Sequence, residues 1–291
     1  MRITNQMQAS FVTRSMQANL ARMAELQEQG TSGRKLVRAS SDPSAAADAL
    51  SVRNQLATEK QYQRNIENGD GWLSTLDSAL RSVTDVVQRV RDLVMQGASD
   101  TASPDAREAI AVELDELRSE LLRQSNTTYL GRNVFAGTSD EGVAFRDDYT
   151  FTGVPGSSVE RRIGADSTVQ VDIDGAAVFG AGAGSVFALL DTVVADLRAG
   201  TNVRSHLGAV DSRLSAVLTQ HTTVGARQNQ LERATDTNAD SQLALKTQRA
   251  GIEDADIAEI AIDLQLKQVA YQATLSIGSN LLQPTLMDYL R

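Results

Sequence analysis

The sequence predicts a mainly α-helical protein, an elongated antiparallel helical bundle or coiled coil built from both chain ends, with a small β-rich insertion domain. Apolar residues alternate spacings of three and four over residues 73–94, which is a heptad pattern. The same spacing continues over 203–231, where His221 and Gln228 take two of the otherwise apolar positions. Residues 126–186 replace this period with strand-like alternation and glycine turns. Aromatic residues make up only 4% of the 291 residues, which favours Leu-, Val- and Ala-based packing between helices.

The first expected helix covers residues 3–29. Its apolar residues recur mostly four positions apart, as on one helix face: Ile3, Met7, Phe11, Met16, Leu20 and Met23. Gly30 and Gly33 then interrupt the pattern. Asp42 can cap a new helix whose first residue is Pro43, because proline lacks an N–H that the first turn could not pair. We therefore predict a joint at Gly33, Asp42 and Pro43.

A very long second helix is expected from this joint to about Ala98. Its buried seam is predicted to contain Leu73, Leu76, Leu80, Val83, Val87, Val90 and Val94. Ser103 and Pro104 repeat the cap-then-proline pattern after a turn at 98–107. A shorter helix can then fold back antiparallel to the long one, with Ile110, Leu114, Leu117 and Leu121 on one face.

The insertion and the second seam follow. Strands are expected at YTFTG (149–153) and STVQVDIDG (167–175), joined by glycine turns. Helix returns at about Ser185 and ends near Gly200. A second seam then pairs with the first and closes the bundle, and its predicted core residues are Leu207, Val210, Leu214 and Val217.

The last expected helix, 257–283, follows a joint at Gly251 and an N-cap at Asp256. It is apolar on two faces, one with Ile260, Leu264, Tyr271 and Leu275, the other with Ile262, Leu266, Val269, Ala273 and Ile277. A helix that is apolar nearly all round must be buried, although a chain end is usually mobile. We therefore expect other copies or neighbouring proteins to cover it.

The predicted assembly interface combines the apolar residues of both chain ends. It contains Ile3, Met7, Phe11, Met16, Leu20, Ile260, Leu264, Leu266, Val269, Tyr271, Leu275, Ile277, Leu281, Leu282, Leu286, Tyr289 and Leu290. Residues 1–60 carry eight bases and five acids, whereas residues 250–291 carry six acids and two bases. Opposite charges therefore favour pairing of the two ends, although each exposed ion pair contributes only ~0–1 kcal/mol.

These patterns suggest three domains. Residues 1–41 with 252–291 form an inner coiled-coil polymerisation domain, 42–132 with 185–251 form the helical bundle core, and 133–184 form a β-rich outer insertion.

Composition excludes several functional classes. A net charge of −9 argues against nucleic-acid binding, which needs clustered cations. The absence of cysteine excludes disulfides and Cys-ligated zinc. No run approaches ~18 consecutive apolar residues, and the first residues lack the pattern of a cleaved signal peptide, so neither a membrane span nor a signal peptide is expected.

Motifs that could carry chemistry have simpler structural interpretations. The Asp172–Gly175 stretch resembles the start of a calcium loop, but Ala183 stands where the twelfth-position Glu is needed. The glycines at 180–184 depart from a dinucleotide-binding spacing. His206 and His221 are predicted to be structural. We expect no enzyme activity, no metal and no cofactor.

Several stretches resemble bacterial flagellins and their relatives. They are TSGRKL (31–36), SSDPSAAADAL (40–50), Asn65 with Gly69-Asp-Gly71, LVMQGAS (93–99) and AGIEDADIAE (250–259). Within that family, the ending LLQPTLMDYLR (281–291), NVFAGT (133–138) and the short insertion resemble proteins of the hook–filament junction more than the filament subunit.

The resemblance implies a structural, self-assembling component of the bacterial flagellum, exported through the flagellar type III apparatus without signal cleavage. It implies a short homo-oligomeric ring outside the cell at the hook–filament junction, on which the flagellin filament is built. Implied partners are the chain itself, the other hook-associated junction protein, flagellin and an export chaperone. The alternatives are flagellin itself, a cytoplasmic coiled-coil scaffold, which the insertion and two-faced last helix fit poorly, and an enzyme.

Overall fold

The computed structural model describes residues 2–99, 103–154 and 156–282. The chain divides into two compact units. We call Met1–Thr58 with Ser241–Arg291 the terminal unit, and Glu59–Asp240 the bundle unit. The long helices α2 (Pro43–Gly97) and α6 (Leu207–Glu253) contribute residues to both units. The predicted mainly α-helical fold is confirmed.

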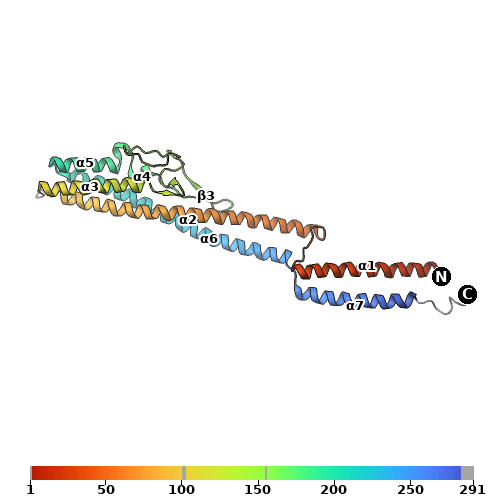
Figure 1. Ribbon diagram of the computed structural model, residues 1–291. Coiled ribbons are helices and arrows are strands. Elements are labelled where there is room, and N and C mark those ends of the chain that lie inside the picture. The colour runs from red at the N-terminus through yellow and green to blue at the C-terminus, as the bar shows by residue number, and fades with distance from the viewer. Residues whose placement is uncertain (1, 100–102, 155, 283–291) are drawn as a thin grey trace, which may run out of the picture. The chain divides into compact units, whose positions relative to one another are not determined.

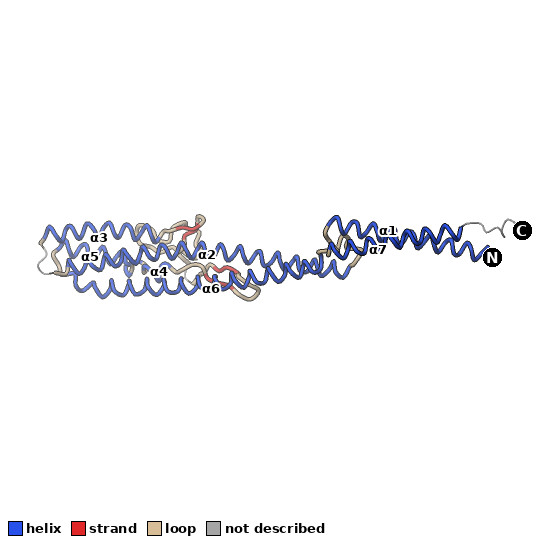
Figure 2. Tube along the Cα trace, turned by 90° about the horizontal axis from the view of Figure 1, so that it is seen from below, coloured by secondary structure: helices blue, strands red, loops and turns tan. Residues whose placement is uncertain are grey.

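The bundle unit is built on α2 and α6, which run antiparallel. Asp77 Oδ1 lies 2.8 Å from His221 Nε2, and Arg91 Nε donates to Asp211 Oδ1 at 2.6 Å. Two shorter helices, α3 (Pro104–Ser125) and α5 (Val186–Ala199), lie beside each other against this pair (Figures 1 and 2). Ser103 caps α3 by accepting from the Ala106 N–H, as the sequence predicts.

One continuous apolar core fills the bundle unit. All seven predicted seam residues of α2 are buried within it, together with Val210 and Val217 of α6. Leu207 and Leu214 pack against the core while only half-buried. Trp72, which is 2% exposed, is the largest fully buried side chain.

The insertion is less regular than predicted. Strands β1 (Thr128–Tyr129) and β2 (Arg132–Asn133) form one hairpin, and β3 (Glu160–Arg162) pairs antiparallel with β4 (Thr168–Gln170). The predicted strand at 149–153 is wrong. Tyr149 takes a left-handed φ of 65°, which breaks extended geometry, and an isolated bridge joins Phe145 to Phe151.

The predicted strand at 167–175 is also too long. Asp174 accepts the Ala176 N–H and caps a short helix, α4 (Gly175–Phe179), which the sequence analysis missed. Two 3₁₀ turns, η1 (Gly182–Gly184) and η2 (Val203–His206), precede α5 and α6 respectively. The glycine stretch at 180–184 therefore leads into a helix, and it lies outside any βαβ unit.

Asn126 fastens the insertion to the end of α3. Its side-chain oxygen accepts the N–H groups of Ala144 and Phe145, and its amide donates to the Phe145 carbonyl at 2.9 Å. Around this anchor Phe145, Phe179 and Phe187 pack ring against ring. The insertion thus shares the core of the bundle unit.

Shortening a core leucine is expected to destabilise the bundle unit. Leu80 is 0% exposed, so Leu80→Ala should lower the free energy of unfolding by ~2–5 kcal/mol through lost burial and a cavity. Leu130 is 78% exposed and provides the matched control. Leu130→Ala should change the free energy of unfolding by less than about 0.5 kcal/mol. Denaturant titration measures both. Equal effects would contradict the assignment of this core.

Candidate assembly interface

The two chain ends pair in the terminal unit. Helices α1 (Arg2–Ser32) and α7 (Ile257–Leu282) lie side by side and antiparallel (Figure 2). A Cβ placed on Gly30 would lie 3.4 Å from Ile260 Cγ2, and one on Gly278 would lie 3.1 Å from Val12 Cγ1. Gly278 therefore allows the two helices to approach closely, whereas a side chain at position 30 would make an ordinary contact. We call α1 with α7 the terminal helix pair.

The terminal unit has very little apolar core of its own. Among its described residues, the buried apolar side chains are Leu26, Ala49, Val52 and Leu56. None of these belongs to α7. Burial of apolar surface is the main favourable term in folding, at ~25 cal/mol per Å². The terminal helix pair therefore gains little stability from contacts within one chain.

Helix α7 presents one apolar face to α1 and a second one to solvent. Ile260, Leu264 and Tyr271 are half-buried on the inner face. The outer face leaves four large side chains exposed: Ile262 at 61%, Leu266 at 61%, Val269 at 59% and Ile277 at 56%. Leu275, which the sequence pattern groups with the inner face, is 44% exposed.

The first helix also exposes apolar residues. Met7 is 66% and Phe11 69% exposed, while Leu20 is 46% exposed and Met16 is half-buried. Contiguous exposed apolar surface on a protein marks an interaction site. Ile3 lies in α1, and Leu281 and Leu282 lie in α7. Leu286, Tyr289 and Leu290 lie outside the described residues.

The joint at the N-terminal side begins after α1. Gly33 takes a left-handed φ of 66°, which glycine adopts without strain. The side chain of Asp42 accepts hydrogen bonds from the Ala45 N–H, the Ser44 hydroxyl and the Ser44 N–H, and these bonds, that from Ala45 most, lower the pKa of its carboxyl. Pro43 is the first residue of α2. Gly30, in contrast, continues α1 and does not break it.

The joint at the C-terminal side lies at 254–256. Gly251 is inside the last turn of α6, so the break comes a few residues later than the sequence pattern suggests. A glycine can stay helical where the neighbouring turns hold it. Asp256 caps α7 by accepting the Ala258 N–H at 2.8 Å.

The remaining candidate groups have structural partners. His206 Nε2 lies 2.7 Å from Asp196 Oδ2, and His221 pairs with Asp77 as described above. Asp172 is 1% exposed and accepts the Val159 N–H, and its burial raises the pKa of the carboxyl. The described residues contain no group of three or more His, Asp or Glu arranged to hold a metal ion.

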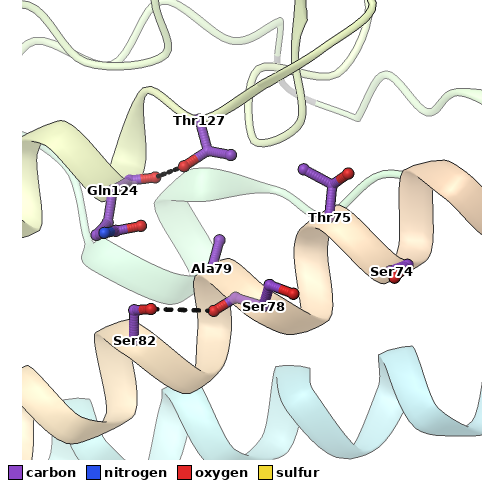
Figure 3. A pocket seen from close by; sticks show the side chains of 7 residues that line it. All are labelled: Ser74, Thr75, Ser78, Ala79, Ser82, Gln124 and Thr127. Carbon is purple, nitrogen blue, oxygen red and sulfur yellow. Dashed lines mark hydrogen bonds between the residues drawn. The ribbon is translucent and has the colours of Figure 1, made fainter.

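A hollow of about 340 Å³ on the bundle unit is lined by small and polar side chains: Ser74, Thr75, Ser78, Ala79, Ser82, Gln124 and Thr127 (Figure 3). The Ser82 hydroxyl donates to the Ser78 carbonyl, and the Thr127 hydroxyl donates to the Gln124 carbonyl. The residues that line this hollow include no acid or base that could activate a hydroxyl. Within the described ranges, no helix has both the length and the hydropathy needed to cross a bilayer.

Comparison with known protein families shows which family has this arrangement of helices. The bacterial flagellin N-terminal helical region matches residues 3–140, and the bacterial flagellin C-terminal helical region matches residues 207–290. The chain belongs to the bacterial flagellin family. The two matched regions contain all of α2, α6 and α7 and nearly all of α1.

Members of the flagellin family with different roles are similar to the chain along its length. Flagellar hook-associated protein 3 of Salmonella typhimurium is 26% identical, covering 94% of this chain and 95% of that protein. The flagellar filament 31.3 kDa core protein of Treponema maltophilum is 27% identical, covering 93% and 92%.

Solved structures of the flagellin family share the fold. FlgL of Bacillus cereus matches with a TM-score of 0.60 at 22% identity, covering 69% of this chain and 99% of that one. The flagellar junction protein FlgL of Legionella pneumophila matches with a TM-score of 0.58 at 16% identity, covering 71% and 99%. At these identities the likeness shows the fold alone.

Proposed function

We propose that the chain is a structural subunit of the bacterial flagellum that assembles as a short ring at the hook–filament junction and is the adaptor on which the flagellin filament is built. The observation that carries this proposal is the outer face of α7. Four large apolar side chains stay exposed on a chain end, in a family of structural flagellar proteins.

The proposed mechanism couples folding of the ends to assembly. Ordering a residue costs ~1–2 kcal/mol, and the terminal unit buries few apolar side chains to offset that cost. Contacts with neighbouring copies supply the missing burial. Residues 1–41 with 252–291 then form the inner polymerisation domain, 42–132 with 185–251 the bundle core, and 133–184 the outer insertion.

Two stretches of the chain's own sequence favour the junction role over the filament role. The ending LLQPTLMDYLR and the stretch NVFAGT (133–138) resemble junction proteins of the family, and the hook-associated relative spans nearly the whole chain. Flagellin, the filament subunit, is the second candidate. A filament core protein shares 27% identity with this chain over 93% of its length, close to the values for the hook-associated relative.

The proposed location and partners of the chain follow from the junction role. The chain acts outside the cell after export through the flagellar type III apparatus, held unfolded by an export chaperone. In the ring it contacts copies of itself, the other hook-associated junction protein on one side and flagellin on the other. Its role is structural, with no enzyme activity.

Deletion of the gene tests the proposal in a strain with a single copy. We expect bare hooks in electron micrographs and unpolymerised flagellin in the medium, because filament subunits then have no adaptor to build on. Bare hooks with no flagellin in the medium would identify the chain as the filament subunit. Intact filaments would overturn both roles. Complementation with the intact gene is the control.

A further inference from the structure

A buried carboxylate lies at the joint between the terminal helix pair and the two long helices. Glu253 is the last residue of α6 and is only 6% exposed. Its Oε1 accepts a hydrogen bond from Arg53 Nε of α2 at 2.7 Å, from a residue 200 positions away in the chain. A buried charge is costly unless it is paired, so this contact stabilises the carboxylate in its buried position.

Three cations from different segments act on this one carboxylate. Arg53 in α2 lowers the pKa of Glu253 most, through its hydrogen bond, and Arg249 in α6 and Arg34 in the linker after α1 lower it further. In the described part of the chain, neither Arg34 nor Arg249 has a salt bridge of its own. Among the described residues, Arg53 is thus the one cation in ion-pair contact with Glu253, and Arg249 and Arg34 act on its carboxylate at longer range.

The main chain at the same residue holds the linker. The Lys35 N–H donates to the Glu253 carbonyl at 2.8 Å, and the Ala255 N–H donates to the Gly33 carbonyl at 3.1 Å. Arg34 and Asp254 form an antiparallel bridge between these bonds. Glu253 thus binds α2 through its side chain and the linker after α1 through its backbone.

We infer that Glu253 is the electrostatic hub of the joint, whose single negative charge lets the linker after α1, the start of α2 and the end of α6 converge. This inference rests on the proposed function only for its consequence, which is that the hub orders the joint from which the polymerising helices extend. Glu253→Gln keeps the shape and an acceptor for Arg53, but it removes the negative charge on which Arg53, Arg249 and Arg34 act.

Amide hydrogen exchange on the purified full chain tests the hub. Lys35 and Ala255 donate across the joint, so both amides should be protected in the intact chain. In Glu253→Gln their exchange should accelerate by about tenfold or more, as expected when a charge-assisted contact is lost. Removing one of the cations that act on position 253 should reverse this, so Glu253→Gln with Arg249→Gln should restore much of the protection.

Two single substitutions are the matched controls. Glu25 forms an exposed pair with Arg22 inside α1, and Glu25→Gln should leave both amides unchanged. Arg249 is exposed, and Arg249→Gln alone should also have no effect. Three outcomes would each overturn the inferred role of Glu253. They are unprotected amides in the intact chain, equal exchange in Glu253→Gln and Glu25→Gln, and no recovery of protection in the double variant. Normal filaments in the deletion strain would instead overturn the proposed function, whatever the exchange rates.

Discussion

Leu266→Asp is expected to block assembly while the thermal melt of the free chain stays nearly unchanged. Leu266 is 61% exposed on the outer face of α7, so in the free chain the substitution costs only the difference in helix propensity, less than about 1 kcal/mol. In an assembly this face is covered, and an unpaired buried carboxylate costs several kcal/mol or more. Calorimetry measures the thermal stability of the free chain, and sedimentation or electron microscopy of polymers measures assembly.

Two variants of the same helix sharpen this comparison. Gln268 is exposed and polar, so Gln268→Asp adds the same charge without removing apolar surface and should assemble better than Leu266→Asp. Leu264 is half-buried on the inner face, so Leu264→Asp should disturb the terminal helix pair in the free chain as well. A large loss of stability in Leu266→Asp would show that its face is core, contrary to the proposal.

Limited proteolysis of the free chain is expected to trim both ends and leave a stable fragment containing Glu59–Asp240. A protease cuts where the backbone opens locally at low cost, and the terminal helix pair has few buried contacts to oppose opening. The bundle unit, with its continuous core, should resist. Mass spectrometry of the fragments locates the cuts, and they should lie within α1 and α7.

The assembled protein is the control for this experiment. Polymer formed by the same preparation should protect α1 and α7, because neighbouring copies then cover the outer face. If the ends of a monodisperse monomer resist protease as well as the bundle does, folding of the ends is independent of assembly and the proposed coupling fails.

The helices were predictable because local rules and packing agree on them. Asp42, Ser103 and Asp256 each cap a helix as their positions suggest, and the seam from Leu73 to Val94 is buried as a heptad pattern requires. The two faces of α7 could also be anticipated, because its apolar residues exceed what one neighbouring helix can cover.

The insertion was less predictable because side chains and turns override strand patterning there. Tyr149 adopts a left-handed conformation that β propensity does not anticipate, and Asp174 diverts the chain into a short helix. The Arg53–Glu253 pair could not be anticipated either. No sequence pattern links two residues 200 positions apart, and only the fold brings them together.

The position of the chain's one tryptophan has a consequence for spectroscopy. Trp72 lies in the bundle unit, buried against Tyr129 and beneath the guanidinium of Arg161, so its emission reports on that environment alone. Tryptophan fluorescence will therefore report unfolding of the bundle unit and will change little when the chain ends polymerise. A fluorophore that senses polymerisation has to be introduced at an exposed terminal position such as Phe11, where a neighbouring copy would change its surroundings.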